Sequence, residues 1–317
     1  MPTVEPDTPR LTEPPRTVLN KRRHIGLEER AFRSVALDYW DLVKPEISFL
    51  VAISALAGFF LASGRSIDVV LLAHTIGGIL TSAAGAGMLN HVLERRFDRQ
   101  MRRTMTRPLA AGRISVKVAA TLGISLGLLG SLYLAYFVNP LTGGLSLLTV
   151  FMYIGVYTPL KRVTKLNTII GCIPGALPAL GGWTAATGEL GAGGWALFGV
   201  LFAWQMPHFL ALAWMYRKDY DRGGFAMLPV VEPDGDSTAL QTVLFTVLLI
   251  SVSLIPYGLD LSGRVYLVGV LALGALFLRA SARFFRTRSN ADAKRVLLAS
   301  VLYIPLFVAV VVVDQLV

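Results

Sequence analysis

The sequence predicts an all-α fold class, a polytopic membrane helical bundle of nine transmembrane helices. Of the 317 residues, 54% are hydrophobic and only 16% are charged, whereas a soluble protein carries about 25% charged residues. The apolar residues also gather in segments close to the ~20 residues that a helix needs to cross the hydrocarbon core. The predicted spans are residues 47–63, 69–89, 115–137, 141–158, 167–187, 193–216, 239–259, 262–283 and 296–316.

The distribution of basic residues predicts how these spans are oriented. The chain has a net charge of +10, but nearly all of its Lys and Arg residues lie before the first span or in the loops after even-numbered spans. Because cytoplasmic loops are enriched in Lys and Arg, we expect the N-terminus inside the cell and the C-terminus outside. The basic charge therefore indicates topology rather than nucleic-acid binding. The exceptions are Arg65, Lys117, Arg264, Arg279 and Arg283, the last of which ends a predicted span.

The N-terminal residues 1–35 are predicted to be a disordered cytoplasmic tail. They are rich in Pro, Glu and Arg and lack the apolar stretch of a signal peptide, which favours a bacterial plasma (inner) membrane as the location. A short amphipathic segment near Val35–Val43 follows, and residues 36–317 are expected to form one membrane domain. The single cysteine, Cys172, excludes an internal disulfide and a cysteine-rich zinc site.

A charged strip follows the second span. On a helix, Asn90, Glu94 and Asp98 are spaced at i, i+4 and i+8, so their side chains lean toward one broad face. Two carboxylates and an amide oxygen suit Mg²⁺, and the following Arg103 and Arg107 suit an anionic phosphate ligand. The alternative is a solvated loop of mixed charge, which is less favoured because a second strip of similar character occurs later.

The second strip starts at Trp204–Phe209, with the sequence WQMPHF, and ends in an acidic pair, Asp219 and Asp221. The acids could be further hard ligands at the membrane edge, or they could be surface charge at a capped helix end. A diphosphate with bridging Mg²⁺ would use carboxylates from two facing helices, because Mg²⁺ is usually held by one or two carboxylates plus substrate phosphates. The two acidic strips therefore favour one shared site.

One histidine, His208, lies near the end of the sixth span beside Trp204 and Gln205. A buried histidine in a membrane helix is a candidate functional residue. It could orient a porphyrin, coordinate iron or transfer a proton. A hydrogen-bonded histidine with a structural role is an equally open interpretation.

A third strip, Tyr157–Asn167, is a short cationic turn after the fourth span. Its Lys161 and Arg162 could bind phosphate oxygens, or they could be ordinary cytoplasmic charge. All three strips lie on the predicted cytoplasmic side. A transporter would more naturally place ionisable groups at the middle of the bilayer, so the pattern favours an enzyme.

The strips together resemble the UbiA superfamily of intramembrane prenyltransferases, and in particular its haem-farnesylating branch. The resemblance covers residues 38–317 and implies the UbiA-type fold of nine helices. Four motifs carry it, in the expected order and at the expected helix junctions. They are Asn90, Glu94 and Asp98 followed by Met101–Leu109; Tyr157–Asn167; Trp204–Phe209; and Asp219-Tyr220 with Met227–Pro229.

The sequence departs from this family pattern at three places. Glu94 stands where many relatives have Asp, which keeps the charge but lengthens the arm. Glu46 follows Lys44-Pro45, where an Arg is common. The second acidic strip lacks the spaced D-x-x-x-D of the wider superfamily, which makes Asp219 a better ligand candidate than Asp221.

The resemblance implies transfer of farnesyl from farnesyl diphosphate to a vinyl group of haem B, with water addition, giving haem O and diphosphate for terminal oxidases. It implies Mg²⁺ as cofactor, the lipid bilayer as surroundings, and haem A synthase or oxidase assembly proteins as partners. The alternatives are a prenyltransferase acting on 4-hydroxybenzoate, a naphthoate or a chlorin, and a transporter or scaffold that binds haem or lipid.

The resemblance also assigns roles to residues. The catalytic and metal-binding set it implies is Asn90, Glu94, Asp98 and Asp219. The substrate-binding set is Arg103, Arg107, Tyr157, Lys161, Arg162, Trp204, Gln205 and His208.

Overall fold

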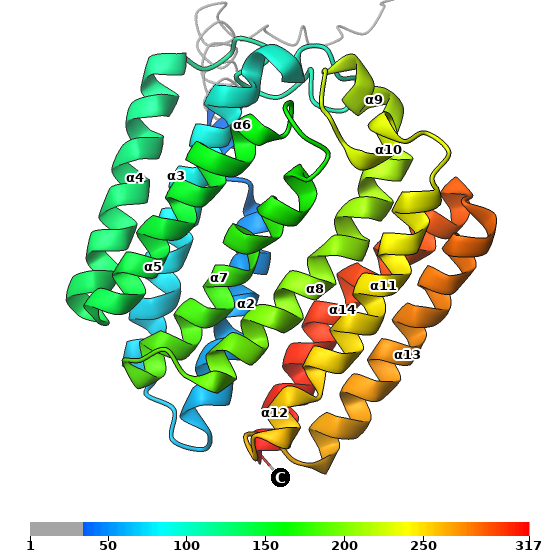
Figure 1. Cartoon of the computed structure of the whole chain (residues 1–317). Coiled ribbons are helices and arrows are strands. Elements are labelled where there is room, and N and C mark those ends of the chain that lie inside the picture. Colours follow the sequence, from blue (N-terminus) through cyan, green and yellow to red (C-terminus); the bar gives the residue numbers. More distant parts are fainter. Residues whose placement is uncertain (1–33, 317) are drawn as a thin grey trace, which may run out of the picture.

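The computed structural model describes residues 34–316, and within them nine helices are long and apolar enough to cross a membrane. These helices run side by side along one common direction (Figure 1). No β-strand occurs in this described range, so the predicted all-α class with nine spans is confirmed. The predicted tail lies outside the described residues except for its last two, which belong to a helix over residues 34–42.

Most spans are single helices, and a few are built from consecutive pieces. The fourth span consists of α5, the π-helix η1 and α6, and the seventh combines α11 and α12. Two short helices, α9 and α10, lie in the loop after α8. The bounds are α2 (Pro45–Ser63), α3 (Val69–Asp98), α4 (Val116–Phe137), α5 (Pro140–Phe151), η1 (Met152–Tyr157), α6 (Thr158–Leu160), α7 (Asn167–Thr187), α8 (Ala192–Met215), α9 (Arg217–Arg222), α10 (Leu228–Val231), α11 (Asp236–Ser253), α12 (Ile255–Gly258), α13 (Arg264–Thr287) and α14 (Asn290–Leu316).

Local sequence signals explain where several helices begin and end. Asp68 caps α3 by accepting hydrogen bonds from the backbone N–H groups of Val70 and Leu71, at 3.0 and 2.9 Å. Asn139 caps α5 in the same way, since its side chain accepts from Thr142 N at 2.8 Å. Such caps satisfy backbone donors that the first turn of a helix leaves free. Gly188 ends α7 in the left-handed conformation, which glycine adopts without steric cost.

Helix α3 is longer than the hydropathy of the sequence predicts. The predicted span ends at residue 89, whereas the helix continues without a break to Asp98. The segment contains no Pro or Gly, so nothing in its backbone stops the helix, and the side chains of Asn90, Glu94 and Asp98 are buried inside the protein. Asn90, Glu94 and Asp98 therefore all belong to one continuous helix.

Helices α2 and α7 approach each other closely through small residues. A Cβ atom added at Gly58 would lie 2.0 Å from Ala179 O, and one added at Gly182 would lie 1.9 Å from Ala55 O. Helices in lipid associate through such tight backbone packing, because the hydrophobic effect does not drive them together. This contact fixes α7 beside α2 in the middle of the bundle.

Replacement of Gly182 by alanine is therefore expected to destabilise the protein by about 1–3 kcal/mol, the usual cost of overpacking. The neighbouring Gly181→Ala is a matched control, because its added Cβ meets no atom within 4 Å. That variant should keep or slightly raise stability, since Ala favours helix over Gly. Unfolding by SDS in mixed micelles measures the stability of both variants. Equal losses would show that the close approach is not what limits stability.

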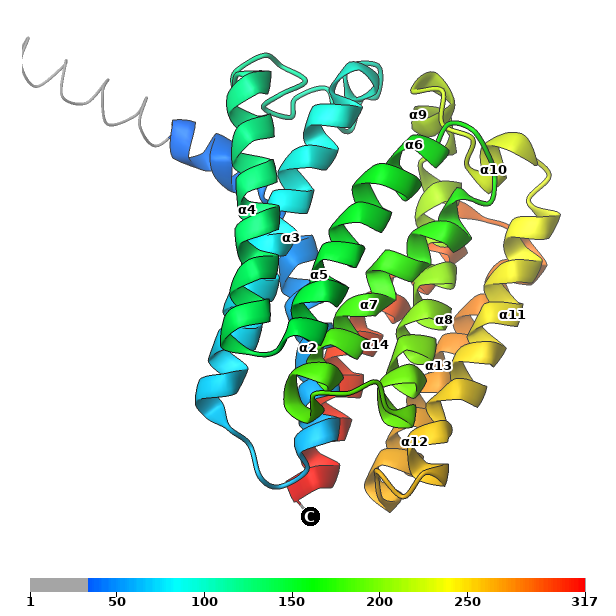
Figure 2. The same cartoon turned by 60° about the vertical axis from the view of Figure 1, so that its left-hand side comes forward.

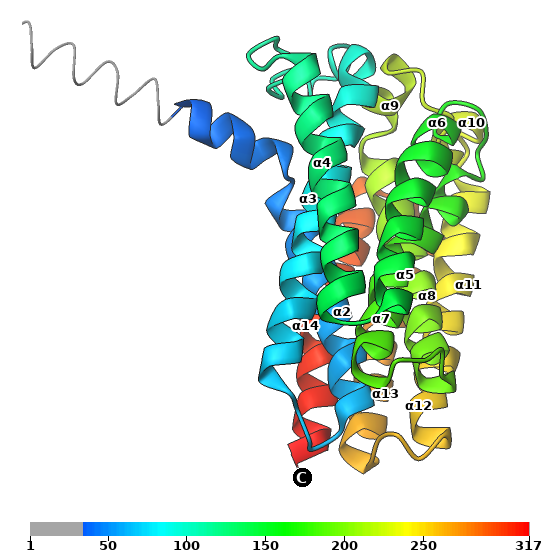
Figure 3. The same cartoon turned by 90° about the vertical axis from the view of Figure 1, so that its left-hand side faces the viewer.

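The bundle has two halves that meet along α7 and α8. One half contains α2, α3, α4, α5 and α7, and the other contains α8, α11, α13 and α14 (Figures 1 and 2). Contacts of α7 with α8 and of α2 with α14 join them. The short helices α6, α9 and α10 lie at one end, together with the Lys- and Arg-rich loops (Figures 1 and 3). The predicted gathering of basic loops at one end is thus confirmed.

Candidate active site

A cavity of about 500 Å³ lies between the two halves of the bundle. Its walls come from α2, α3, α5, η1, α7 and α8, and the volume is typical of small-molecule sites. Near the end that carries α6 and α9, charged side chains line it; along the spans, the lining is mostly apolar. The charged members are Lys44, Glu46, Glu94, Asp98, Arg103, Arg107 and Lys161.

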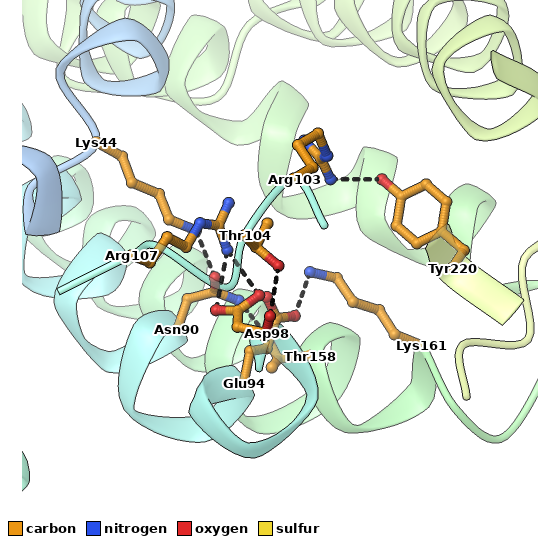
Figure 4. Close-up of polar contacts among 10 residues, drawn as sticks. All are labelled: Lys44, Asn90, Glu94, Asp98, Arg103, Thr104, Arg107, Thr158, Lys161 and Tyr220. Atoms are coloured by element: carbon orange, nitrogen blue, oxygen red, sulfur yellow. Dashed lines mark hydrogen bonds and ion pairs between the residues drawn. The ribbon is translucent and has the colours of Figure 1, made fainter. Parts of the chain in front are cut away.

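The two carboxylates of α3 are buried and each is paired with a cation. Glu94 and Asp98 are only 6% and 1% exposed, and acidic residues are almost never buried to this extent unless they are paired. Lys161 Nζ donates to Glu94 Oε1 at 2.6 Å, and Arg107 Nη1 lies 3.0 Å from both oxygens of Asp98 (Figure 4). The predicted acidic face therefore meets two of the predicted basic residues, Lys161 and Arg107, in one place.

Asn90 is held in a fixed orientation beside these acids. Its Nδ2 donates to Thr158 Oγ1 at 3.2 Å, and Thr158 in turn donates to Tyr153 O at 2.8 Å. Its Oδ1 accepts a hydrogen bond from Lys44 Nζ (Figure 4). The amide oxygen, which is the atom able to bind a metal, thus points toward the cationic side of the site.

Lys44 is a site residue that sequence reasoning missed. It precedes the proline that starts α2 and adopts a left-handed backbone conformation with φ of 49°, which is uncommon outside glycine. Burial lowers the pKa of Lys44 to about 7, although nearby Glu94 acts against this shift. In the sequence Lys44 resembles ordinary charge before a membrane span, and the only signal that marks it is the proline that follows it, Pro45.

Lys161 is surrounded by the carboxylate of Glu94 and by aromatic rings. Its Nζ lies 4.6 Å from the centroid of the Tyr157 ring. Burial disfavours the ammonium, but Glu94 and the tyrosines outweigh it and keep the pKa of Lys161 above its ordinary value. Tyr153 and Tyr157 belong to η1, the kind of helical irregularity often found at functional sites. The π-helix therefore supplies two cavity-lining rings.

Three more of the predicted site residues lie near the mouth of the site. Arg103 lines the cavity, lies over Tyr216 with its Cζ 5.0 Å from the ring centroid, and donates to Tyr220 Oη at 3.3 Å. Arg162 does not line the cavity; its Cζ lies 4.0 Å from the centroid of the Phe97 ring. Asp219 is also outside the lining, and its carboxylate pairs with Arg222.

The residues gathered here fit a metal that arrives with its substrate. Glu94 and Asp98 are close together, whereas Asp219 does not join them, and residues 34–316 contain no cluster of three His, Cys, Asp or Glu side chains that could hold a metal ion. Asn90 adds an amide oxygen. Because Mg²⁺ is usually bound by one or two carboxylates plus substrate phosphates, this donor set suits Mg²⁺ bound to a diphosphate.

Helix α8 contributes the three predicted residues of the WQMPHF motif to the cavity wall. Trp204 Nε1 donates to Ser300 O at 2.8 Å, and Gln205 Nε2 donates to Cys172 O at 3.2 Å. His208 Nδ1 lies 2.8 Å from Ser300 Oγ. These bonds fix the side chains against α7 and α14.

The fold and site place the chain in a known class of membrane enzymes. The UbiA prenyltransferase family matches residues 51–309, and the chain belongs to that family. It is 57% identical over 277 residues to the protoheme IX farnesyltransferase of Salinibacter ruber, an alignment that covers 87% of this chain and 98% of the relative. The predicted enzyme class and haem-related branch agree with these findings.

Two solved structures share the fold. The chain matches a digeranylgeranylglyceryl phosphate synthase with a TM-score of 0.72 at 18% identity, covering 88% of this chain and 98% of that one. It also matches a UbiA homologue from Archaeoglobus fulgidus, bound to GPP and Mg²⁺, with a TM-score of 0.63 at 17% identity over 86% and 99% of the two chains. The UbiA-type helical fold is therefore shared across this family.

Proposed function

We propose that this protein transfers the farnesyl group of farnesyl diphosphate to a vinyl group of haem B, with addition of water, and releases haem O and diphosphate. The observation that carries the proposal is the pair of buried ion pairs, Glu94–Lys161 and Asp98–Arg107, at the charged end of a largely apolar cavity. The 57% identity to a protoheme IX farnesyltransferase supports haem as the acceptor.

The charged end would bind the diphosphate head. Asn90, Glu94 and Asp98 would hold Mg²⁺, which supplies positive charge that offsets the charge of the leaving group. Lys161 and Arg107 then exchange their carboxylate partners for phosphate oxygens, since both groups form strong charge-assisted hydrogen bonds. Asp219 would join the site only by exchanging Arg222 for the metal.

The other two predicted phosphate-binding residues, Arg103 and Arg162, differ in whether they line the cavity. Arg103 already lines the cavity and can add a phosphate contact from the loop after α3. Arg162 is held outside the lining by Phe97 and by Gly224 O, to which its Nε donates at 3.3 Å. Its contribution to phosphate binding therefore requires it to leave these contacts.

The apolar part of the cavity would stabilise and protect the cation formed from farnesyl diphosphate. Cleavage of the C1–O bond leaves an allylic cation, which the faces of Tyr153, Tyr157 and Trp204 can stabilise and shelter from water. The vinyl terminal carbon then forms a bond to C1, and water adds to the other vinyl carbon with loss of a proton. Burial of the farnesyl tail favours binding by about 0.8 kcal/mol per CH₂.

The test is mass spectrometry of haem after incubation of purified protein with haem B, farnesyl diphosphate and Mg²⁺. We expect a haem product heavier by one farnesyl group and one water, and no product when EDTA removes the metal. Unmodified haem from folded protein would overturn haem as acceptor and favour 4-hydroxybenzoate, a naphthoate or a chlorin. Haem binding without diphosphate release under any of these conditions would favour a transporter or scaffold.

We propose further that the end carrying α6, α9 and α10 faces the cytoplasm of a bacterial inner membrane, with the N-terminus on that side. A haem A synthase or an oxidase assembly protein would then receive the product. Membrane-impermeant maleimide labelling tests the orientation, because the native Cys172 is buried. Lys218→Cys should react only from the cytoplasmic side and Glu189→Cys only from the other. The reverse pattern would overturn the orientation.

A further inference from the structure

Ser300 on α14 connects two residues of the cavity wall, although it was not singled out by any sequence motif. Its carbonyl oxygen accepts from Trp204 Nε1 at 2.8 Å, and its hydroxyl oxygen lies 2.8 Å from His208 Nδ1. The hydroxyl itself donates to Leu297 O at 2.6 Å. Ser300 is completely buried and thus ties α8 to α14 at one point.

These bonds determine which nitrogen of His208 carries the proton. A serine hydroxyl has one hydrogen, and that of Ser300 is already donated to Leu297 O. Its oxygen can therefore only accept from His208, so Nδ1 must be the protonated nitrogen. In the neutral ring the other nitrogen, Nε2, then keeps a free lone pair.

The free nitrogen belongs to a ring that lines the cavity and is held in place. The His208 ring stacks on Trp204 with centroids 5.3 Å apart, and Phe209 packs edge-on at 5.3 Å. Among residues 34–316, Nε2 has no hydrogen-bond partner, and no carboxylate contacts the ring to favour its charged form. The geometry thus presents a fixed, neutral imidazole nitrogen to the cavity.

We propose that Ser300 is a positioning residue that fixes His208 as the Nδ1–H tautomer, so that Nε2 serves as an axial ligand to the iron of a porphyrin in the cavity. This inference rests on the proposed haem acceptor. Imidazole nitrogens are common ligands of haem iron, and a metal-binding histidine usually donates its second N–H to a fixed acceptor. Axial ligation would orient the flat acceptor relative to the diphosphate.

Titration of the purified protein with ferric haem tests the proposal without farnesyl diphosphate. Electron paramagnetic resonance and the Soret band report the axial ligand, and metal-free protoporphyrin IX reports binding of the ring alone. The wild-type protein should show an imidazole-ligated iron. His208→Ala should lose this signal and regain it with added imidazole, whereas its affinity for the metal-free ring should be unchanged.

The Ser300 variants separate positioning from folding. Ser300→Ala should weaken binding of the iron porphyrin about 10–100-fold, the usual effect of removing the partner of a metal-ligating histidine. Binding of metal-free porphyrin should not change, and Ser300→Thr should restore the iron signal. Ser281→Ala is the matched control. Ser281 is equally buried and forms a hydrogen bond of 2.9 Å with Thr246, but it does not line the cavity. That variant should behave as wild type.

Two outcomes would overturn the inference. One is an iron spectrum that His208→Ala leaves unchanged, and the other is an equal loss of iron and metal-free porphyrin binding in Ser300→Ala. Failure of the proposed function looks different. If the proposed function is wrong, haem would be ligated by His208 but never farnesylated. If only the ligand role is wrong, His208→Ala would still farnesylate haem and its iron spectrum would be unchanged.

Discussion

Replacement of Asp98 by alanine is expected to reduce haem farnesylation by about 10³-fold. Loss of one group that stabilises charge in the transition state typically has an effect of this size. Asp98 is 1% exposed, and both its oxygens lie 3.0 Å from Arg107 Nη1. The substitution removes a ligand of the proposed Mg²⁺ and also the partner that holds Arg107 at the proposed diphosphate site. Product formation measured by mass spectrometry at saturating Mg²⁺ gives the effect.

The fold should survive this change. The Arg107 side chain is 27% exposed, so it can reach solvent when its partner is lost. Asp98→Glu should retain more activity than the alanine variant because a carboxylate remains. A matched control is Asp38→Ala, which also breaks an Arg–Asp pair, with Arg113 at 2.8 Å, outside the cavity. Wild-type activity in Asp98→Ala, or equal losses in both alanine variants, would contradict the assignment.

The membrane architecture and the acidic face of α3 are predictable from sequence because both depend on local patterns. Apolar segments of about 20 residues identify spans, and the i, i+4, i+8 spacing places Asn90, Glu94 and Asp98 on one face wherever a helix forms. Hydropathy misses the C-terminal end of α3, after residue 89, and the N-terminal end of α14, before residue 296. At the end of α3, Asn90, Glu94 and Asp98 are buried by protein rather than exposed to lipid, so the helix continues past the apolar segment.

The partners of these acids are not predictable in the same way. Lys161 lies 67 residues from Glu94 in the sequence, and which cation faces which acid is decided by how α3 packs against the fourth span. The same reason explains why Arg162 contacts Phe97 and Asp219 pairs with Arg222 instead of lining the cavity. A serine in an apolar helix gives no signal at all, so Ser300 emerges only from the packing of α8 on α14.

Loss of the Lys161 ammonium is expected to damage both stability and activity. In Lys161→Met, Glu94 is left as an unpaired carboxylate that is 6% exposed. Removal of one partner from a buried ion pair costs about 3–5 kcal/mol, because the remaining charge is desolvated without compensation. Unfolding by SDS in mixed micelles should show this loss in the absence of substrate. Lys165→Met is the control: its pair with Glu232 lies in exposed surroundings, and neither stability nor activity should change.

The double variant Glu94→Gln/Lys161→Met separates the two roles of Lys161. Removal of both charges leaves no buried unpaired ion, so most of the lost stability should return. Activity should stay low, because the double variant lacks one proposed ligand for Mg²⁺ and one proposed cation for the diphosphate. Recovery of activity in the double variant would mean that Lys161 only neutralises Glu94. A stable but inactive protein, with weakened binding of farnesyl diphosphate, would show that the pair exchanges partners when substrate binds.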